Sequence, residues 1–153
     1  MQIRSFAAAD TEAVVALWEQ CGLVRAWNDP RKDIARKLTV QPELFLVGVD
    51  DEAADRADLD GSSDAEATVI GTAMVGYDGH RGWINYLAVS PDHRGRGYGR
   101  AFMDEAERLL IALGCPKLNL QVREGNDSVI AFYEAIGYAN DRTVSLGKRL
   151  IAD

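Results

Sequence analysis

The chain has 153 residues, 47% of them hydrophobic, and a formal net charge of −7. This length suits a single domain, residues 1–153, with a substantial hydrophobic core. Apolar runs stay well below the roughly 18 residues of a membrane span, and the N-terminus lacks the charged-then-apolar pattern of a secretory signal. We therefore expect a soluble, cytoplasmic protein with no membrane partner.

Charge distribution and cysteine spacing restrict the partners further. Residues 50–66 hold eight acidic residues and one arginine, which leaves 16 acidic and 16 basic residues elsewhere. No basic stripe remains to bind nucleic acid. Cys21 and Cys115 lack metal-ligand spacing, so we expect reduced thiols and no metal site, with a single disulfide as the alternative.

The acidic segment, residues 50–66, has no hydrophobic periodicity and is rich in Ala, Asp and Ser. This composition predicts a long, solvated hairpin loop that the fold tolerates as an insert. The alternative is a docking segment for a protein partner, which would make the chain an interaction module.

The N-terminal part alternates strand and helix patterns. A strand at Gln2–Phe6 leads into a helix that Asp10 is expected to cap. Asp29 followed by Pro30 is a typical helix start, with proline at the first helical position. A second, shorter helix is expected there, followed by an apolar strand at residues 43–49.

After the acidic segment, strands at residues 68–77 and 83–89 are joined by Asp78-Gly79, a strong hairpin signal. A long amphipathic helix follows and ends before Gly114. The remaining patterns predict a strand at 117–122, a helix at 126–136, and two short strands around Tyr138 and at 143–150. Together they predict a mixed α/β (α+β) fold, with about six or seven mostly antiparallel strands and about four helices on both faces.

The corner between residues 83–89 and the long helix is the strongest site signal. Three glycines alternate with arginines at Arg94, Gly95, Arg96, Gly97, Tyr98, Gly99 and Arg100. Exposed N–H groups at a helix start, with cations beside them, form an anion site, so we expect phosphate binding. The spacing matches neither a dinucleotide fingerprint nor a P-loop. A tight, solvated turn with surface arginines is the alternative.

A second candidate lies on the helix at residues 126–136. Asn126 and Tyr133 are seven residues apart, close to two helical turns, so both project from one face. A tyrosine stays protonated at neutral pH and can act as a proton donor. The alternative is a half-buried core tyrosine with a solvated hydroxyl.

These motifs resemble the GNAT superfamily of N-acetyltransferases. The likeness covers about residues 71–137 and rests on Arg94-x-x-Gly97-x-Gly99 after a strand, then Asn126 and Phe132-Tyr133-x-x-x-Gly137-Tyr138. Further stretches, at residues 23–30, 76–82 and 145–150, are similar to the bacterial YpeA subgroup.

The resemblance implies a GNAT-like sheet whose two middle strands splay apart to hold acetyl-CoA. The pantetheine arm would bond to the main chain of Leu87, Ala88 and Val89. The pyrophosphate would rest on the corner at residues 94–100, and Asn126 would also contact the cofactor. Tyr133 would act as the general acid that protonates the leaving thiolate.

The general base departs from the family pattern. Relatives carry a glutamate early in the central strand or in the fifth strand, where this chain has Trp83 and Gln121. Asp78 and His80 are the candidate substitutes, although both residues also suit a plain turn. We expect either a low-pKa amine acceptor, such as an α-amine, or deprotonation through ordered water near Asn85.

The acceptor would bind between the first two helices. Trp27, Asn28 and Asp29 are the candidate substrate residues there, with Trp27 in the core and Asp29 as a helix cap as the alternative. The predicted function is acetyl transfer to an amine on a small molecule or a peptide N-terminus. A non-catalytic acyl-CoA-binding sensor is the alternative, and a homodimer is a further expectation.

Overall fold

The computed structural model describes residues 1–50 and 68–152, so nearly all of the predicted acidic loop lies outside the described residues. The N-terminal elements are β1 (Gln2–Ser5), α1 (Thr11–Gln20), α2 (Pro30–Leu38) and β2 (Phe45–Val49). They are followed by β3 (Val69–Tyr77), β4 (Gly82–Val89), α4 (Tyr98–Ala112), β5 (Leu118–Leu120) and α5 (Asp127–Ala135). No helix in these residues is long and apolar enough to cross a membrane.

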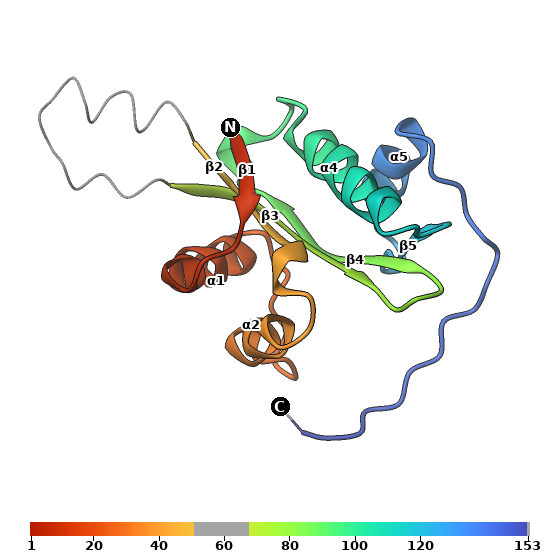
Figure 1. Ribbon diagram of the computed structural model, residues 1–153, viewed down its shortest axis with the longest axis horizontal. Helices are drawn as coiled ribbons and strands as arrows, with labels where there is room; N and C mark the ends of the chain where they lie inside the picture. The colour runs from red at the N-terminus through yellow and green to blue at the C-terminus, as the bar shows by residue number, and fades with distance from the viewer. Residues whose placement is uncertain (51–67, 153) are drawn as a thin grey trace, which may run out of the picture.

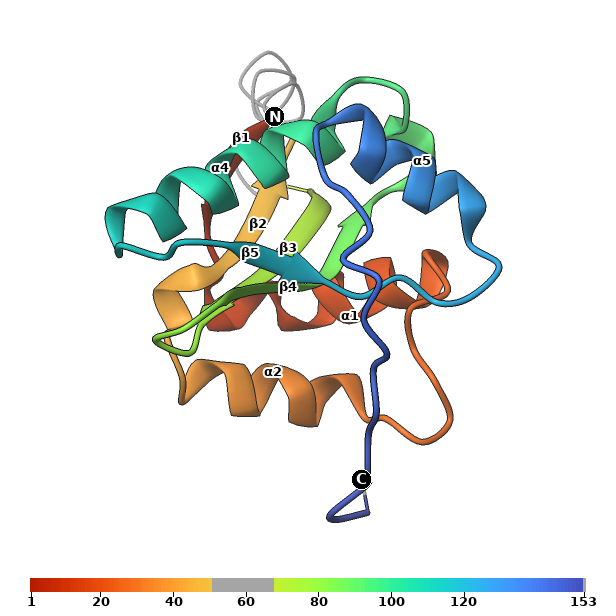
Figure 2. The ribbon, with the colours of Figure 1, turned by 90° about the vertical axis from the view of Figure 1, so that its right-hand side faces the viewer.

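The described strands form one sheet in the order β1-β2-β3-β4-β5. Neighbouring strands are antiparallel except for β4 and β5, which are parallel. Helices α1 and α2 cover one face of this sheet, and α4 and α5 cover the other (Figures 1 and 2). The predicted mixed α/β fold with helices on both faces is therefore confirmed.

The strand count differs from the prediction. The sheet has five strands within the described residues, and the two short strands expected around Tyr138 and at residues 143–150 are absent there. Val144, Leu146 and Leu150 have a strand-like composition but are 85%, 91% and 86% exposed. A strand needs a hydrogen-bonded neighbour. This segment pairs with no strand among the described residues, and it curves outward at one side of the molecule (Figure 1). The alternating pattern is present in the sequence, but no described strand lies beside it.

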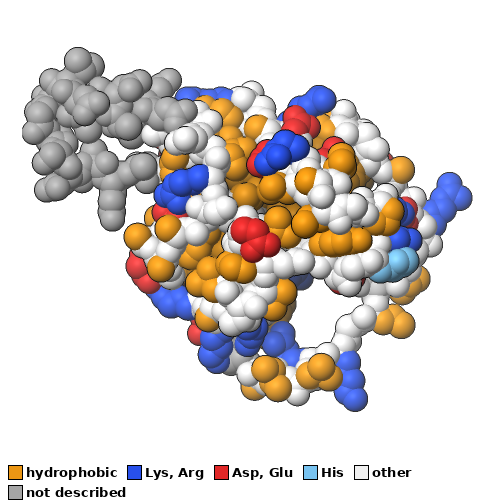
Figure 3. All heavy atoms as spheres, in the orientation of Figure 1, with side chains coloured by type: hydrophobic (Ala, Val, Ile, Leu, Met, Phe, Trp, Pro, Cys, Tyr) orange, Lys and Arg blue, Asp and Glu red, His pale blue; other side chains and the backbone are white. Residues whose placement is uncertain are grey.

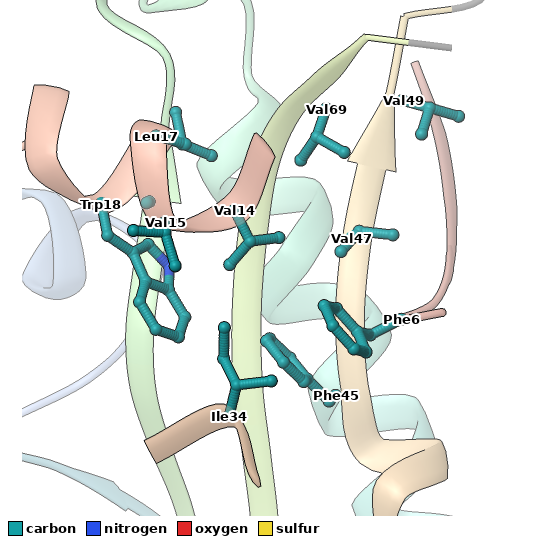
Figure 4. Close-up of a cluster of buried hydrophobic side chains, with 11 residues drawn as sticks. Phe6, Val14, Val15, Leu17, Trp18, Ile34, Phe45, Val47, Val49 and Val69 are labelled. Atoms are coloured by element: carbon teal, nitrogen blue, oxygen red, sulfur yellow. The ribbon is translucent and has the colours of Figure 1, made fainter. Parts of the chain in front are cut away.

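Two hydrophobic clusters pack on opposite faces of the sheet. On the α1–α2 face, the fully buried Trp18 and Phe45 lie at the centre, and Phe6 stacks on Phe45 with ring centroids 4.5 Å apart (Figure 4). On the other face, Phe102 and Met103 of α4 are fully buried against the sheet. Each cluster buries one stripe of an amphipathic helix, which is the main force that holds the layers together.

Close packing of α4 depends on a glycine in β3. A Cβ atom built on Gly71 would lie 2.5 Å from Cε2 of Phe102, well inside van der Waals contact. Because Phe102 is fully buried, its ring has no room to move aside. Gly71 therefore lets the helix approach the sheet closely.

The two cysteines lie in different clusters. Cys21 packs against the α1–α2 side and Cys115 against the α4–α5 side, and both are free thiols. Residues on opposite faces of a sheet cannot meet disulfide geometry, so the single-disulfide alternative has no support.

The helix starts are only partly as predicted. Asp29 caps α2, because its carboxylate accepts hydrogen bonds from the backbone N–H groups of Arg31 and Lys32. The prediction that Asp10 caps α1 is wrong. A 3₁₀ turn precedes α1, and the Asp10 carboxylate instead accepts from the N–H of Ala7 at 2.8 Å and from Arg4 at 2.7 Å.

Candidate active site

The expected splay between the middle strands is present. The parallel pairing of β4 with β5 begins at Gly82 and Leu118 and ends at Ile84 and Leu120. Strand β4 nevertheless continues to Val89. Within the described part of the chain, no strand pairs with β4 on its β5 side beyond Ile84. Leu87, Ala88 and Val89, the predicted pantetheine contacts, all lie on this continuation.

A β-bulge sits at the point where the strands separate. Met74 pairs with Asn85 and Thr72 pairs with Ala88, so β4 carries one residue more than β3 between these pairs. Tyr86, inside the bulge, has a φ of 51°, which is the left-handed region that side-chain-bearing residues seldom adopt.

The bulge changes which side chains share a face. Side chains normally alternate along a strand, yet Asn85 and Tyr86 both point toward the α1–α2 face. Tyr86 stacks on Trp18 with ring centroids 3.9 Å apart, and Asn85 lines a pocket against α2. The bulge therefore brings two polar side chains together where the strands separate.

The glycines of the corner have structural roles of their own. Gly95 and Gly97 have φ values of 75° and 79°, and Gly97 occupies the residue before α4. A Cβ on Gly99 would lie 3.3 Å from Cζ of Phe132, so Gly99 permits close packing of α4 on α5. Turn geometry and packing together explain all three glycines. The number of glycines in the corner is therefore not independent evidence for phosphate binding.

What remains of the anion site is the helix start and its cations. Arg94 and Arg96 are exposed, and neither has an ion-pair partner among the residues described. Arg100 pairs weakly with Asp104 at 3.8 Å, and Tyr98 is half-buried at the first position of α4. The free N–H groups at the start of α4 thus face solvent beside the end of β4, with the guanidinium groups of Arg94 and Arg96, which pair with no described residue.

Tyr133 lies in a buried aromatic cluster. Its ring meets Tyr138 edge to face at 5.7 Å, and its side chain also lines a groove of about 970 Å³ bounded by β5, α4 and α5. Burial raises the pKa of its hydroxyl to about 12. Asn126 precedes the first residue of α5 and is exposed, and its side chain does not cap the helix.

Asp78 and His80, the candidate general bases on the hairpin, lie outside the pocket that contains Asn85. The Asp78 carboxylate accepts from the backbone N–H groups of Arg81 and His80 and from Nε1 of Trp83. These bonds lower its pKa to about 2, which makes it a poor proton acceptor. The structure thus gives Asp78 the turn-forming role that was the plain alternative.

Of the three candidate residues for binding the acceptor, one lines the pocket and two do not. Asn28 lines the pocket with Asn85, whereas Trp27 is 56% exposed and Asp29 caps α2. The alternative that placed Trp27 in the core is wrong. Sequence reasoning missed Asp33, whose carboxylate lies 2.6 Å from the Tyr86 hydroxyl.

Nothing in the one-dimensional pattern pointed to this pair. Fifty-three residues separate Asp33 from Tyr86, and the bulge that turns Tyr86 toward α2 has no sequence signature of its own.

The described residues contain no group of three or more His, Cys, Asp or Glu side chains placed to hold a metal.

Comparison with known proteins agrees with this geometry. The model of the "Acetyltransferase (GNAT) family" matches residues 12–138. A Yersinia pestis (strain Pestoides F) protein named "Acetyltransferase" is 51% identical over 153 residues, which cover 100% of this chain and 98% of that protein.

Two solved structures share the fold at low identity. The ribosomal-protein-S18-alanine N-acetyltransferase of Escherichia coli has a TM-score of 0.66 and 22% identity, over 89% of this chain and 76% of that one. AAC(6')-Iy, solved with the bisubstrate analogue CoA-S-monomethyl-acetylneamine, has a TM-score of 0.70 and 17% identity, over 97% of both chains. With a family match across most of its length and a relative at 51% identity, the chain belongs to the acetyltransferase (GNAT) family.

Proposed function

We propose that this acetyltransferase moves an acetyl group from acetyl-CoA to the amine of a small molecule or peptide, by direct attack of the amine. The observation that carries the proposal is the edge of β4 beyond Ile84, which β5 leaves open. An extended polyamide such as pantetheine can bond to such an edge as an added strand would. Leu87, Ala88 and Val89 supply the main-chain groups.

The start of α4 suits the pyrophosphate of the same molecule. The N–H groups of Gly97, Tyr98 and Gly99 are the free donors of a helix start, and the guanidinium groups of Arg94 and Arg96 are exposed nearby. Gly95 and Arg100 complete the corner, and Asn126 at the start of α5 is a further contact. This part of the proposal rests on helix geometry and charge.

The chemistry balances without an additional reactant. Acetyl-CoA supplies an activated acyl group as a thioester. A C–N bond forms and the C–S bond breaks. The amine gives one proton to water, the departing thiolate gains one from the Tyr133 hydroxyl, and Tyr133 then regains a proton from water. A main-chain N–H of β4 stabilises the negative charge that develops on the carbonyl oxygen.

The raised pKa of Tyr133 bears on its role as the acid. Transfer from a hydroxyl of pKa about 12 to a thiolate of pKa about 8.5 in water would be uphill by about 5 kcal/mol. The difference between the two pKa values is smaller in a buried site, because the desolvation that raises the pKa of the tyrosine also raises that of the thiol. Tyr133 therefore works as an acid only in a site closed to water.

The acceptor is an amine of low pKa, such as an α-amine, because no carboxylate stands where relatives carry their base. Trp83 and Gln121 occupy those positions, and Asp78 is committed to its turn. The other route is deprotonation of the amine through ordered water near Asn85. The names of the two related structures cover both acceptor classes, a ribosomal-protein alanine in one and an acetylneamine analogue in the other.

A homodimer is part of the proposal. Val144, Leu146, Leu150 and Ile151 are exposed on the C-terminal segment, the last part of which stands away from the body of the molecule (Figure 3). The same chain offers a groove beside β5, lined by both apolar and polar side chains. Lys148 and Arg149 accompany the apolar side chains, and Glu107 and Glu134 line the groove. The exposed apolar side chains of the segment and the opposite charges of segment and groove favour the segment of a second copy of this chain as the occupant of the groove.

Release of free thiol from acetyl-CoA, measured against a panel of free amino acids, polyamines, aminoglycosides and peptide N-termini, tests the function. We expect an amine-dependent rate that falls about 10²-fold or more in Tyr133→Phe. Tyr138→Phe is the matched control, since Tyr138 lines the same groove but bonds to Glu107. Heat on binding acetyl-CoA with no thiol release for any amine would indicate a sensor instead of an enzyme.

A further inference from the structure

A pocket of about 430 Å³ lies between α2 and β4, on the face of the sheet opposite α4 and α5. Asn28, Asn85 and Tyr86 provide neutral polar groups, and Val40 and Met74 provide an apolar wall. This volume lies at the small end of the range for ligand sites, which spans about 300 to 1,000 Å³. It fits a molecule the size of an amino acid.

The charge of this pocket is opposite to that of the chain. Arg36 and Lys37 line it, and Asp33 is the one acidic lining residue within the described ranges. The lining therefore carries a formal excess of positive charge in a protein whose net charge is −7. A polycation such as an aminoglycoside or a polyamine would meet repulsion here.

Lys37 has the most distinctive environment. Its ammonium group is half-buried and donates to the carbonyl oxygens of Val40 at 3.0 Å and Val75 at 2.6 Å. An ammonium group has three donors, so these two bonds leave a third. Burial lowers the pKa of Lys37, an effect that nearby Glu43 opposes, and Glu43 is exposed and does not line the pocket. An anionic ligand group would offset the cost of holding this charge out of water.

The opposite charge lies at the open edge of β4. Oδ2 of Asp33 accepts a hydrogen bond from the Tyr86 hydroxyl at 2.6 Å and another from the Asn28 amide. Oδ1 of Asp33 accepts from Arg36 at 3.0 Å. Tyr86 sits in the bulge next to Asn85, where β4 leaves β5. The Tyr86 hydroxyl also accepts a hydrogen bond from the Asn28 amide at 3.0 Å. The Asp33 carboxylate beside it is a group to which an ammonium ion can bind.

We propose that the acceptor is a small zwitterionic amine, an α-amino acid or a close analogue, held by its carboxylate at Lys37 and by its amino group at Asp33 and Tyr86. The inference rests on the proposed acetyl transfer and narrows its acceptor class. Asp33 acts here as a positioning group for the amine, and Lys37 as the residue that selects for the carboxylate. An internal peptide segment or a polyamine has no anionic group for Lys37.

Matched pairs of substrates test the proposal. The kcat/KM for free L-amino acids is compared with that for their C-terminal amides, which keep the side chain but lose the negative charge. Each value is divided by the fraction of neutral amine at the assay pH, because the amide has the lower amine pKa. We expect the free acids to be better by about tenfold or more, since charge-assisted hydrogen bonds are stronger than neutral ones. Lys37→Met is expected to abolish this preference by slowing only the acids. Asp33→Asn is expected to slow acids and amides alike.

Two further variants protect the test from a folding defect. Lys37→Arg keeps a cation and hydrogen-bond donors, and is expected to retain the preference for acids. Lys32→Met removes an exposed lysine of the same helix that does not line the pocket, and is expected to match the wild type. Equal kcat/KM for acids and amides in the wild type, or an unchanged preference in folded Lys37→Met, would overturn the proposal.

A binding measurement separates this inference from the proposed function. Melting temperatures are recorded with each free amino acid or its amide at millimolar concentration, without acetyl-CoA. A rise with acids and none with amides supports the pocket even if acetyl transfer were disproved. Transfer to amides and polyamines as fast as to acids would overturn only the acceptor class and leave acetyl transfer intact.

Discussion

The hydroxyl of Thr72 donates a 2.8 Å hydrogen bond to the carbonyl oxygen of Tyr86. The same hydroxyl accepts from Nε1 of Trp18 at 2.9 Å, and the Thr72 side chain is fully buried. One buried hydroxyl thus connects the core helix α1 to the bulge that turns Tyr86 toward the acceptor pocket. Bulged backbone without such a partner would leave a polar group unsatisfied.

Replacing Thr72 by valine is expected to lower the free energy of unfolding by about 3 kcal/mol, because two buried polar groups lose their partner at once. Urea denaturation measures this loss. Thr72→Ser keeps the hydroxyl and removes one methyl group, so it is expected to cost about 1 kcal/mol. A valine variant as stable as the serine variant would mean that the bulge does not depend on this bond.

Gly71→Ala is expected to destabilise the protein by about 2 kcal/mol, because the added methyl group overlaps the buried ring of Phe102 and the core must shift. Gly147→Ala is the control, since no atom lies within 4 Å of a Cβ there. Thermal unfolding of both variants provides the comparison. Equal melting temperatures would show that α4 can move away from β3 at little cost.

Much of the fold followed from sequence because local chemistry and packing agreed. Asp29 before Pro30 predicts the start of α2, and the structure has that helix beginning at Pro30 with Asp29 as its cap. Asp78-Gly79 predicts a hairpin, and β3 pairs with β4 directly across it. In these cases the signal spans only a few residues, so nothing distant could override it.

The features that the sequence did not predict depend on contacts between residues far apart in the chain. The strand pattern at residues 143–150 says which side chains alternate but not whether a neighbouring strand is present. The link between Asp33 and Tyr86 depends on a bulge, which places two consecutive residues of β4 on one face. Both outcomes are set by contacts between residues far apart in the chain, which a single sequence does not display.

The acid sensitivity of the protein is expected to depend on Asp10. Hydrogen bonds from Arg4 lower the pKa of this carboxyl; burial opposes the shift, and the N–H of Ala7 adds to it. A folded-state pKa below the unfolded value of about 3.9 stabilises the protein above that pH. The contribution decreases as the pH falls through the folded-state pKa, where Asp10 takes up a proton.

Asp10→Asn is therefore expected to lower the free energy of unfolding by about 2 kcal/mol at pH 7, and by less below about pH 4. Urea denaturation from pH 7 to pH 2 follows the difference. Glu12→Gln breaks an exposed pair with Arg31, so its effect should be much smaller. A difference for Asp10→Asn that stays constant with pH would contradict the role of its charge.

The C-terminal segment is expected to mediate self-association. Leu146, which is 91% exposed in the single chain, would be covered in a dimer, so Leu146→Asp should shift the protein toward monomer, because the contact would then bury a charge. Light scattering gives the mass of each variant. Ile111→Asp should weaken association too, because Ile111 lines the groove on the other side of the contact. Leu113→Asp is the control, because Leu113 is 49% exposed at the end of α4 but does not line the groove, so its mass should match that of the wild type. A wild type that is monomeric at all concentrations would contradict the proposed dimer.

The central claim is that the open edge of β4 and the corner at residues 94–100 together hold acetyl-CoA. Isothermal titration calorimetry with acetyl-CoA and with acetyl-pantetheine, which lacks the pyrophosphate and nucleotide, tests it most directly. We expect the wild type to bind acetyl-CoA more tightly than acetyl-pantetheine, and the double variant Arg94→Ala, Arg96→Ala to lose most of that difference. No heat of binding with acetyl-CoA, or an identical affinity for both compounds in the wild type, would contradict the claim.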